Sequence, residues 1–251
     1  HPVGERPMLG YTLDLAAELA PEPPVLVIGP ETEEEIRAWA GERARYVRQT
    51  ERLGTGHAVL QTCEMLEGYC DQVLVLYGDM PLLELETLRE LVQRQAETKA
   101  AVGLLTVIRE NPRGFGRILR DVDNRVLSIV EEAEASPRER AIRELNVGVY
   151  VFDADFLWEQ LPKLKPSANK GELYLTDLIG MASRAHRPIV SVTADAPAET
   201  LGINTRVDLA AAEAVLRQRI NREWMLNGVT LIDPATITIG PEVTIGRDTV
   251  I

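Results

Sequence analysis

Short apolar runs alternate with helical spacing through the first hundred residues, and this alternation limits the folds open to the chain. The runs at 25–29, 45–49 and 73–77 are expected to form strands, and helical periodicity lies between them. Closely spaced β and α segments predict an α/β protein with a doubly wound, mainly parallel sheet. The continuous apolar run 25–29 indicates a strand buried on both faces. Helices are expected at 8–19, 31–40 and 84–98, and helical periodicity also follows Ala58 as far as Leu66.

The pattern changes after residue 101, where strands and a hairpin replace the regular alternation. A strand is expected at 101–108, and the pair 117–121 and 126–131 is expected to form a hairpin turned at Asp123-Asn124. The hairpin suggests a lobe that covers a pocket. The segment 133–143 is charged and irregular. The other expected elements are strands at 145–152 and 189–192 and helices at 153–161, 174–185 and 206–225.

Length, charge and cysteine content exclude several kinds of partner. The chain has 251 residues, 45% of them apolar, which suffices for one large α/β domain with or without a small appendage. A net charge of −12 argues against nucleic acid as a partner, and no 18-residue apolar run suggests a membrane span. Cys63 and Cys70 stand seven residues apart in one expected helix, too far to form a disulfide, which predicts reduced thiols in a cytoplasmic protein.

The run ending in Tyr77-Gly78-Asp79 is the strongest local sign of a ligand site. An apolar run that ends in Gly-Asp is typical of a buried strand that places one carboxylate at its C-terminal edge, where open α/β sheets bind ligands. The glycine lets a phosphate come close, and the carboxylate suits a divalent metal that accompanies a nucleotide. The alternative is that Asp79 caps the helix expected at 84–98.

Two neighbouring features could contact a nucleotide base. Gly54-Thr55-Gly56 lies between a short strand and a helix start, where free N–H groups and a close backbone suit a planar or anionic group. Gln49 is expected on the same sheet edge, and its amide can read a uracil-like imide by donating and accepting together. A plain helix N-cap explains the glycine segment about as well, and His57 is expected to be a structural hydrogen-bonding residue rather than a base.

Three polar residues near element ends could hold a sugar or a cation. Asn204 precedes the last long helix, so it could cap that helix or offer its carbonyl oxygen to a hard cation. Glu131 ends the second hairpin strand and Asn146 begins the next strand, so this pair could hold sugar hydroxyls or an amide substituent. Taken singly, Glu131 and Asn146 each read as an ordinary polar residue at a strand end.

The C-terminal residues repeat with a period of six. Ile239, Ile245 and Ile251 are six residues apart, and glycines and threonines keep the same step. One aliphatic residue in each six-residue repeat is typical of a left-handed parallel β-helix, with a simple hairpin or chance as the alternative. We therefore expect one domain at 1–226, then a linker and the first repeats of a β-helix at 227–251, too few repeats to bury a core.

Several motifs occur along the chain in a fixed order. They are His1-Pro2-Val3-Gly4, Gln49 with Leu53-Gly54-Thr55-Gly56-His57-Ala58, Tyr77-Gly78-Asp79-Met80-Pro81-Leu82, Gly114-Phe115-Gly116-Arg117-Ile118, Ile129-Val130-Glu131-Glu132, Glu144-Leu145-Asn146-Val147-Gly148, Gly171-Glu172-Leu173-Tyr174-Leu175-Thr176-Asp177, Gly202-Ile203-Asn204-Thr205-Arg206 and Asn227-Gly228-Val229-Thr230 with Asp233-Pro234. Together they cover essentially the whole chain. The set resembles the N-terminal uridyltransferase domain of the GlmU family, the bifunctional N-acetylglucosamine-1-phosphate uridyltransferase/glucosamine-1-phosphate acetyltransferases. Single motifs are shared with other sugar-nucleotide transferases, so the set is the more specific signal.

The resemblance implies a Rossmann-like nucleotide-diphospho-sugar transferase fold and a reaction. UTP and N-acetylglucosamine 1-phosphate would give UDP-N-acetylglucosamine and pyrophosphate, with Mg²⁺ as cofactor. By position, Asp79 and Asn204 would ligate the magnesium ion, so these two residues must converge although they are distant in sequence. The remaining implied contacts are Gln49, Gly54 and Thr55 to the uracil, Gly116, Glu131 and Asn146 to the N-acetylglucosamine moiety, and Tyr77 and Gly78 to the bound substrate.

The resemblance also implies properties of a whole protein. These are a cytoplasmic homotrimer assembled through the β-helix, a second activity that acetylates glucosamine 1-phosphate, and a place in cell-wall precursor synthesis. The family's glycine-rich pyrophosphate loop is missing and the first expected element is a helix, so we expect further sequence ahead of His1 and little turnover by the 251 residues alone. Another sugar-1-phosphate nucleotidyltransferase and a non-catalytic sugar-nucleotide-binding subunit stay open as alternatives.

Overall fold

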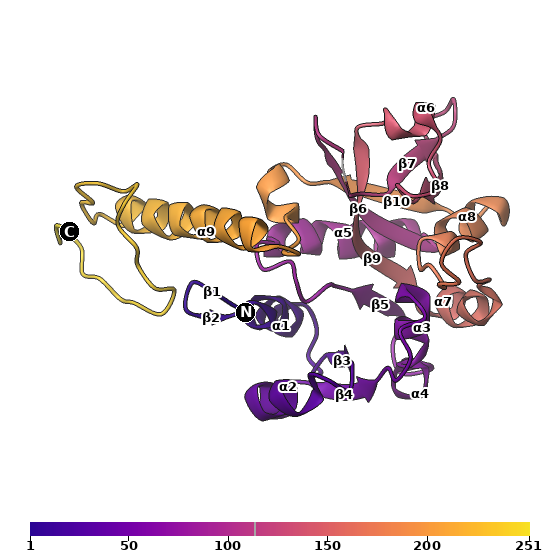
Figure 1. Ribbon diagram of the computed structural model, residues 1–251, viewed down its shortest axis with the longest axis horizontal. Helices are drawn as coiled ribbons and strands as arrows, with labels where there is room; N and C mark the ends of the chain where they lie inside the picture. Colours follow the sequence, from indigo (N-terminus) through magenta and orange to yellow (C-terminus); the bar gives the residue numbers. More distant parts are fainter. Residues whose placement is uncertain (113) are drawn as a thin grey trace. The chain divides into compact units, whose positions relative to one another are not determined.

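The computed structural model describes residues 1–112 and 114–251 (Figure 1). The chain divides into two compact units. We call residues 13–77 and 84–197 the sheet unit, and residues 1–12, 78–83 and 198–251 the helix–tail unit. The division expected from the sequence, at 226, stays a prediction, because the two units follow spatial contacts and not the order of the chain.

The sheet unit is built on a six-stranded sheet in which the long apolar strand β9 has three neighbours. The strands are β5 (Gln72–Val75), β6 (Val102–Ile108), β7 (Arg117–Arg120), β8 (Val126–Val130), β9 (Glu144–Asp153) and β10 (Ile189–Thr193). β10 pairs with β6 in parallel, whereas β9 runs antiparallel to β5, β6 and β7, and β8 pairs antiparallel with β7. The expectation of a mainly parallel sheet is therefore wrong in its pairing. β9 follows the β7–β8 hairpin and not a βαβ crossover, so no connection forces it to run parallel to its neighbours.

A separate pair of strands precedes this sheet. β3 (Val25–Ile28) and β4 (Arg45–Arg48) are parallel to one another and are connected through α2 (Glu33–Ala40) and a 3₁₀ turn at Gly41–Arg43. The predicted burial of β3 on both faces is wrong, because three of its four residues are only partly buried. Among the described strands β3 pairs with β4 alone, so no second strand lies along its other side.

Helices cover both faces of the six-stranded sheet, as the doubly wound pattern predicts. Val102 and Leu104 of β6 share one core with residues of α7 and α8, which lie side by side in Figure 1. Gly103 points to the other face, where a Cβ would lie 3.2 Å from Leu91 and Gln95 of α5. The helices of this unit, besides α2, are α3 (Thr55–Leu60), α4 (Cys63–Leu66), α5 (Leu85–Thr98), α6 (Pro137–Arg140), α7 (Ala154–Gln160) with a 3₁₀ turn at Leu161–Lys163, and α8 (Asp177–Arg184).

Two local expectations in the sheet unit are corrected. The helix expected to hold both cysteines is broken, because α4 ends at Leu66 and Glu67 adopts an extended backbone, so Cys70 lies outside it. Both thiols are free, and burial together with Glu67 raises the pKa of Cys63 to about 11. The segment 133–143, expected to be irregular, contains α6, which a capping box between Ser136 and Glu139 starts.

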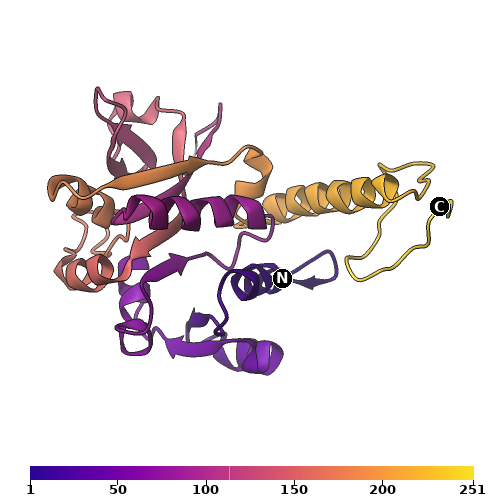
Figure 2. The same cartoon turned by 180° about the vertical axis from the view of Figure 1, so that it is seen from behind.

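The helix–tail unit consists of a short hairpin, a long helix and the C-terminal tail (Figure 2). The hairpin pairs β1 (Pro2–Val3) with β2 (Arg6–Pro7), and α1 (Met8–Leu19) begins here and ends in the sheet unit. α9 (Arg206–Leu226) has the predicted start, and a 3₁₀ turn at Pro197–Thr200 precedes it. Among the described residues, none of the helices has the length and apolar character that crossing a membrane requires.

The tail folds back on itself after α9. An isolated parallel bridge joins Thr230 to Val250, and the N–H of Ile251 donates to the Thr230 carbonyl oxygen at 2.9 Å. Asn221 of α9 is buried, and its Nδ2 donates to the carbonyl oxygens of Pro234 and Ile237, both at 2.8 Å. These bonds hold the tail on the last turns of the helix within this unit.

Candidate active site

Asp79 and Asn204 converge on Gly202 in the helix–tail unit. A Cβ built on Gly202 would lie 3.9 Å from Asp79 Oδ2 and 3.8 Å from Asn204 Nδ2. The backbone fixes this approach, because the N–H of Ile203 donates to the Asp79 carbonyl oxygen at 2.9 Å. Two polar side chains that are distant in sequence therefore share one small region, and the glycine between them leaves it open.

The capping alternatives for these two residues are wrong. The N-cap of α5 is Glu84, not Asp79, and this cap is made without a side-chain capping hydrogen bond. The N-cap of α9 is Thr205, whose Oγ1 accepts from the N–H of Asp208 at 3.1 Å in a capping box. Only the backbone N–H of Asn204 takes part, by donating to Asp208 Oδ2. The side chains of Asp79 and Asn204 thus have no local structural role as helix caps.

The chemistry of this pair fits a magnesium ion. Burial raises the pKa of Asp79, so an approaching cation would relieve the cost of its charge. Rotation of the Asn204 amide brings its carbonyl oxygen to the same side, and hard cations prefer such oxygen ligands. Magnesium commonly takes one or two protein ligands and completes its shell with water and phosphate. In the described part of the chain no group of three or more His, Cys, Asp and Glu residues gathers as a metal site.

Gly116, Glu131 and Asn146 come together on neighbouring strands of the sheet unit. A Cβ on Gly116 would lie 3.5 Å from Asn146 Cβ, 3.6 Å from Glu131 Oε2 and 2.9 Å from Ile129 Cγ2. The N–H of Asn146 donates to the Gly116 carbonyl oxygen at 2.9 Å, which ties the start of β7 to β9. A side chain at position 116 would fill the space that the acid and the amide face.

The Glu131 carboxylate and the Asn146 amide differ in their hydrogen-bond partners. The O–H of Thr176 donates to Glu131 Oε1 at 3.0 Å, and burial is the main reason that the pKa of Glu131 is raised. Asn146 Oδ1 accepts from the N–H of Gly148 at 3.2 Å and from the O–H of Tyr150 at 2.9 Å. The amide oxygen is therefore held, and the Nδ2 group can donate to a ligand.

Tyr77 packs directly on the backbone of β9. A Cβ on Gly148 would lie 2.2 Å from Tyr77 Cε2, and Gly148 has a φ of +92°, so only glycine fits here. Gly78 lies in the helix–tail unit, where a Cβ would meet Leu9 Cδ1 at 3.0 Å. The two residues of this motif thus make close approaches within different units.

The residues expected to contact a base make structural contacts of their own. Gln49 Nε2 donates to the Gly54 carbonyl oxygen at 3.3 Å and lies 3.0 Å from His57 Nδ1, so the Gln49 carbonyl oxygen can accept from an imide N–H. Thr55 Oγ1 accepts from the N–H of Leu175 at 3.0 Å. Gly54, with a φ of +103°, is in close contact with Leu173, whose carbonyl oxygen would lie 2.6 Å from an added Cβ. The ring of His57 lies within hydrogen-bonding distance of Gln49 and Gln61, and its expected structural role stays a prediction.

The segment before α8 contacts both groups of the sheet unit, the residues expected to bind a base and the residues expected to bind a sugar. Leu175 contacts Thr55, and the next residue, Thr176, contacts Glu131. Sequence reasoning missed the roles of Thr176 and Tyr150. The position of Tyr150, four residues after Asn146 in one strand, gives no sign of contact in a regular strand, where side chains so spaced stand about 13 Å apart.

Comparison with known proteins identifies the family to which the chain belongs. The model of the nucleotidyl transferase family matches residues 1–203. The Bifunctional protein GlmU of Solibacter usitatus is 41% identical over 252 residues, covering 100% of this chain and 54% of that protein. The GlmU proteins of Trichlorobacter lovleyi and Desulfotalea psychrophila are 44% and 39% identical, again over 100% of this chain and over 55% and 74% of their own lengths. The chain thus spans about half the length of the first of these relatives.

A solved structure supports the fold independently. A crystal structure of a candidate glucose-1-phosphate thymidylyltransferase from Bacillus anthracis, in complex with a sucrose, superposes with a TM-score of 0.67. The sequences are 22% identical, and the match covers 86% of this chain and 84% of that one. The chain therefore belongs to the nucleotidyl transferase family, and over its whole length it is similar to the bifunctional GlmU proteins.

Proposed function

We propose that this chain carries the uridyltransferase activity of a GlmU-type enzyme. It would transfer the uridylyl group of UTP to N-acetylglucosamine 1-phosphate, giving UDP-N-acetylglucosamine and pyrophosphate. The observation that carries the proposal is the convergence of Asp79 and Asn204 on Gly202, since neither residue caps a helix. Similarity to GlmU proteins over the full chain supports the choice of substrates.

Asp79 and Asn204 would hold Mg²⁺, each through one side-chain oxygen. The bound ion would supply neutralisation of charge on the phosphates. The chemical step is an in-line displacement: an oxygen of the sugar phosphate forms a bond to the α-phosphorus of UTP, and the bond from that phosphorus to the bridging oxygen breaks to release pyrophosphate. No side chain has to act as a nucleophile, so positioning and electrostatics provide the catalysis.

The sheet unit would position the organic parts of the substrates. Glu131 accepts and Asn146 Nδ2 donates, so together they would hold the N-acetylglucosamine moiety in the space that Gly116 leaves open. Gln49, Gly54 and Thr55 would contact the uracil, with the Gln49 carbonyl oxygen accepting from the imide N–H. Tyr77 and Gly78 would complete the contacts to the substrate.

We also propose the domain division at 226 and a left-handed β-helix that begins in the tail. The parallel bridge between Thr230 and Val250 supports it, because stacked coils of a parallel β-helix pair in this way. Val229, Leu231 and Ile239 form a small core that Ile245 joins. The expectation that these repeats bury no core is therefore wrong, because Ile220 and Trp224 of α9 pack against them. A homotrimer assembled through this β-helix, a second acetylating activity and a cytoplasmic location are proposals for the whole protein.

Product analysis tests the proposed reaction. The full-length protein is incubated with Mg²⁺ and each pairing of UTP or dTTP with N-acetylglucosamine 1-phosphate or glucose 1-phosphate, and the products are identified by mass spectrometry. We expect UDP-N-acetylglucosamine to form fastest, and an Asp79→Asn variant to lose on the order of 10²–10³-fold in rate. Preferential formation of a dTDP-sugar or a UDP-hexose would assign the chain to another nucleotidyltransferase, and the absence of any product would favour a sugar-nucleotide-binding subunit.

A further inference from the structure

Tyr150 contacts Asn146, one of the residues proposed to hold the sugar, and is fully buried. Its side chain has no exposed surface, and its ring packs against Phe152 with the centroids 5.6 Å apart. Burial raises its pKa well above the ordinary value for tyrosine, so the hydroxyl keeps its proton at any working pH. A residue so placed cannot touch a substrate, yet it makes one directed polar contact, to Asn146 Oδ1 at 2.9 Å.

An irregularity in β9 makes this contact possible. Leu104 of β6 pairs with Tyr150 of β9, and Thr106 pairs with Asn146. The two paired positions are therefore two residues apart in β6 but four residues apart in β9. The extra residues form a bulge around Gly148, whose φ of +92° is open to glycine only. Bulges re-aim side chains, and here the bulge lets two side chains four residues apart meet.

The two donors on Asn146 Oδ1 decide which way the amide faces. A backbone N–H can only donate, so the contact with Gly148 at 3.2 Å identifies the acceptor as the amide oxygen. The Tyr150 hydroxyl then donates to the same oxygen and fills its second lone pair. With the oxygen occupied on both sides, Nδ2 is the only part of the amide left to meet a ligand.

We propose that Tyr150 is a positioning residue that locks the Asn146 amide so that it presents a donor, beside the acceptor Glu131, to the acetamido group of the bound sugar nucleotide. The inference rests on the proposed function and extends it to specificity. An acetamido carbonyl oxygen matches a fixed N–H donor, whereas a free amide could turn and present an oxygen to a sugar hydroxyl. Tyr150 would thus favour N-acetylglucosamine over an unsubstituted hexose without contacting either.

Substitution of Tyr150 by phenylalanine tests this role, because it removes one hydroxyl and keeps the buried ring. Binding of UDP-N-acetylglucosamine, UDP-glucose and UDP is measured by calorimetry. We expect the Kd for UDP-N-acetylglucosamine to rise about 5–20-fold, with the Kd for UDP unchanged, so that the preference over UDP-glucose falls by the same factor. The matched control is Tyr46→Phe, which removes a hydroxyl that donates to the Gly41 carbonyl oxygen outside the candidate site.

A double-mutant cycle separates positioning from general stability. In an Asn146→Ala background the substitution Tyr150→Phe should have no further effect on the Kd for UDP-N-acetylglucosamine, since the amide it orients is gone. Equal loss in both backgrounds, or an unchanged preference in Tyr150→Phe alone, would overturn the inference. A wild-type protein that binds UDP-N-acetylglucosamine no better than UDP would instead count against the proposed sugar contacts themselves.

Discussion

At the scale of single residues, Asp79 and Glu131 are each in surroundings that disfavour the charged form of a carboxylate. Burial raises the pKa of both Asp79 and Glu131. An acid whose pKa is raised on folding binds more protons in the folded than in the unfolded state. Its contribution to stability is therefore present below the unfolded pKa and is lost as the pH rises through the folded pKa. At neutral pH both charges cost stability, which is expected of groups kept for function.

Replacing Glu131 by glutamine should therefore stabilise the protein at pH 7, because the buried charge is removed and Thr176 keeps an oxygen to which it can donate. A gain on the order of 0.5–2 kcal/mol is typical of a single stabilising substitution. Urea unfolding at pH 7 and at pH 3.5 measures it, and the gain should shrink at the lower pH, where the carboxyl is protonated in both states.

Glu139→Gln provides the control of opposite sign. Hydrogen bonds from Ser136 lower the pKa of this exposed acid, so its charge favours the folded state. This control variant should be less stable than wild type at pH 7. A Glu131→Gln protein that is destabilised at pH 7 would contradict the electrostatic account of the site.

Gly148 is a residue at which a single added methyl group should destabilise the protein. An alanine there must adopt a φ of +92° and bring its Cβ to 2.2 Å from Tyr77. We expect Gly148→Ala to lose about 2–4 kcal/mol of unfolding free energy, from backbone strain and displacement of the ring. Gly68→Ala is the matched control, because φ is +77° and nothing lies within 4 Å of the added carbon, so only the strain of about 1–2 kcal/mol remains. If chemical denaturation gave the same loss of unfolding free energy for both variants, the Tyr77 ring would move aside without destabilising the protein, and the prediction would be wrong.

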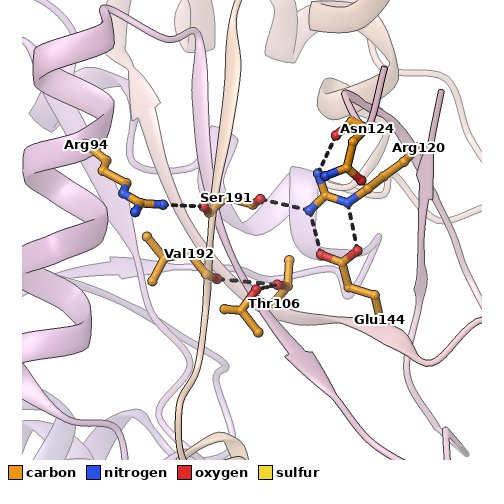
Figure 3. Close-up of polar contacts among 8 residues, drawn as sticks. Arg94, Thr106, Arg120, Asn124, Glu144, Ser191 and Val192 are labelled. Atoms are coloured by element: carbon orange, nitrogen blue, oxygen red, sulfur yellow. Dashed lines mark hydrogen bonds and ion pairs between the residues drawn. The ribbon is translucent and has the colours of Figure 1, made fainter. Parts of the chain in front are cut away.

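At the scale of elements, a polar clamp centred on Arg120 joins three strands of the sheet (Figure 3). Arg120 of β7 donates Nε to Glu144 Oε2 at 2.7 Å and Nη2 to Glu144 Oε1 at 2.6 Å, and Nη2 also donates to Ser191 Oγ of β10 at 2.9 Å. Its Nη1 donates to the Asn124 carbonyl oxygen in the hairpin turn at 2.9 Å. One guanidinium thus joins β7, β9 and β10, and β9 carries Asn146 two residues beyond Glu144.

Removal of the Arg120 guanidinium should lower the free energy of unfolding. With only about a fifth of each side chain exposed, Arg120→Leu leaves Glu144 partly buried without its partner, and we expect a loss of about 1–3 kcal/mol in urea unfolding. The control is Arg125→Leu, because Arg125 and Asp123 form an exposed ion pair at 3.9 Å and its loss should change stability by less than about 0.5 kcal/mol. Equal effects of the two substitutions would mean that the clamp contributes no more than a surface pair.

The elements themselves could be predicted from sequence better than their partners. The bounds of α1 coincide with the prediction and those of α9 differ by one residue, since apolar periodicity is a local signal. The cap of α9 was not predicted, because Thr205 caps this helix and not Asn204. The direction of β9 relative to β6 could not be predicted, because strand pairing depends on connections that periodicity does not encode. The helix expected across both cysteines failed for a local reason, an extended Glu67 that ends α4.

In the candidate site, too, some residues could be identified from the sequence and others could not. Asp79 and Asn204 could be named because short motifs surround them, and the structure adds that they meet at Gly202. Tyr150 could not be named, because its contact with Asn146 depends on a bulge that involves pairing with another strand. Thr176 was likewise part of a recognised motif, but its contact with Glu131 joins segments far apart in sequence.

At the scale of the whole molecule, the proposed contacts are distributed over both compact units. The residues proposed to hold uracil and N-acetylglucosamine belong to the sheet unit, whereas Asp79 and Asn204 belong to the helix–tail unit. The chain carries a net charge of −12 and its substrates are anions, so a cation bound at Asp79 and Asn204 is central to the proposal. Magnesium should therefore change how the protein binds its nucleotide.

The most direct test is the magnesium dependence of UDP-N-acetylglucosamine binding, measured by calorimetry with and without the ion for wild type, Asp79→Asn and Asn204→Ala. We predict that Mg²⁺ tightens binding to the wild type by about tenfold or more and has no such effect on either variant. Asp14→Asn, which removes an exposed carboxylate that pairs with Arg43, should keep the wild-type response. If Mg²⁺ strengthened binding equally in wild type and both variants, Asp79 and Asn204 would not hold the ion and the proposed mechanism would be wrong.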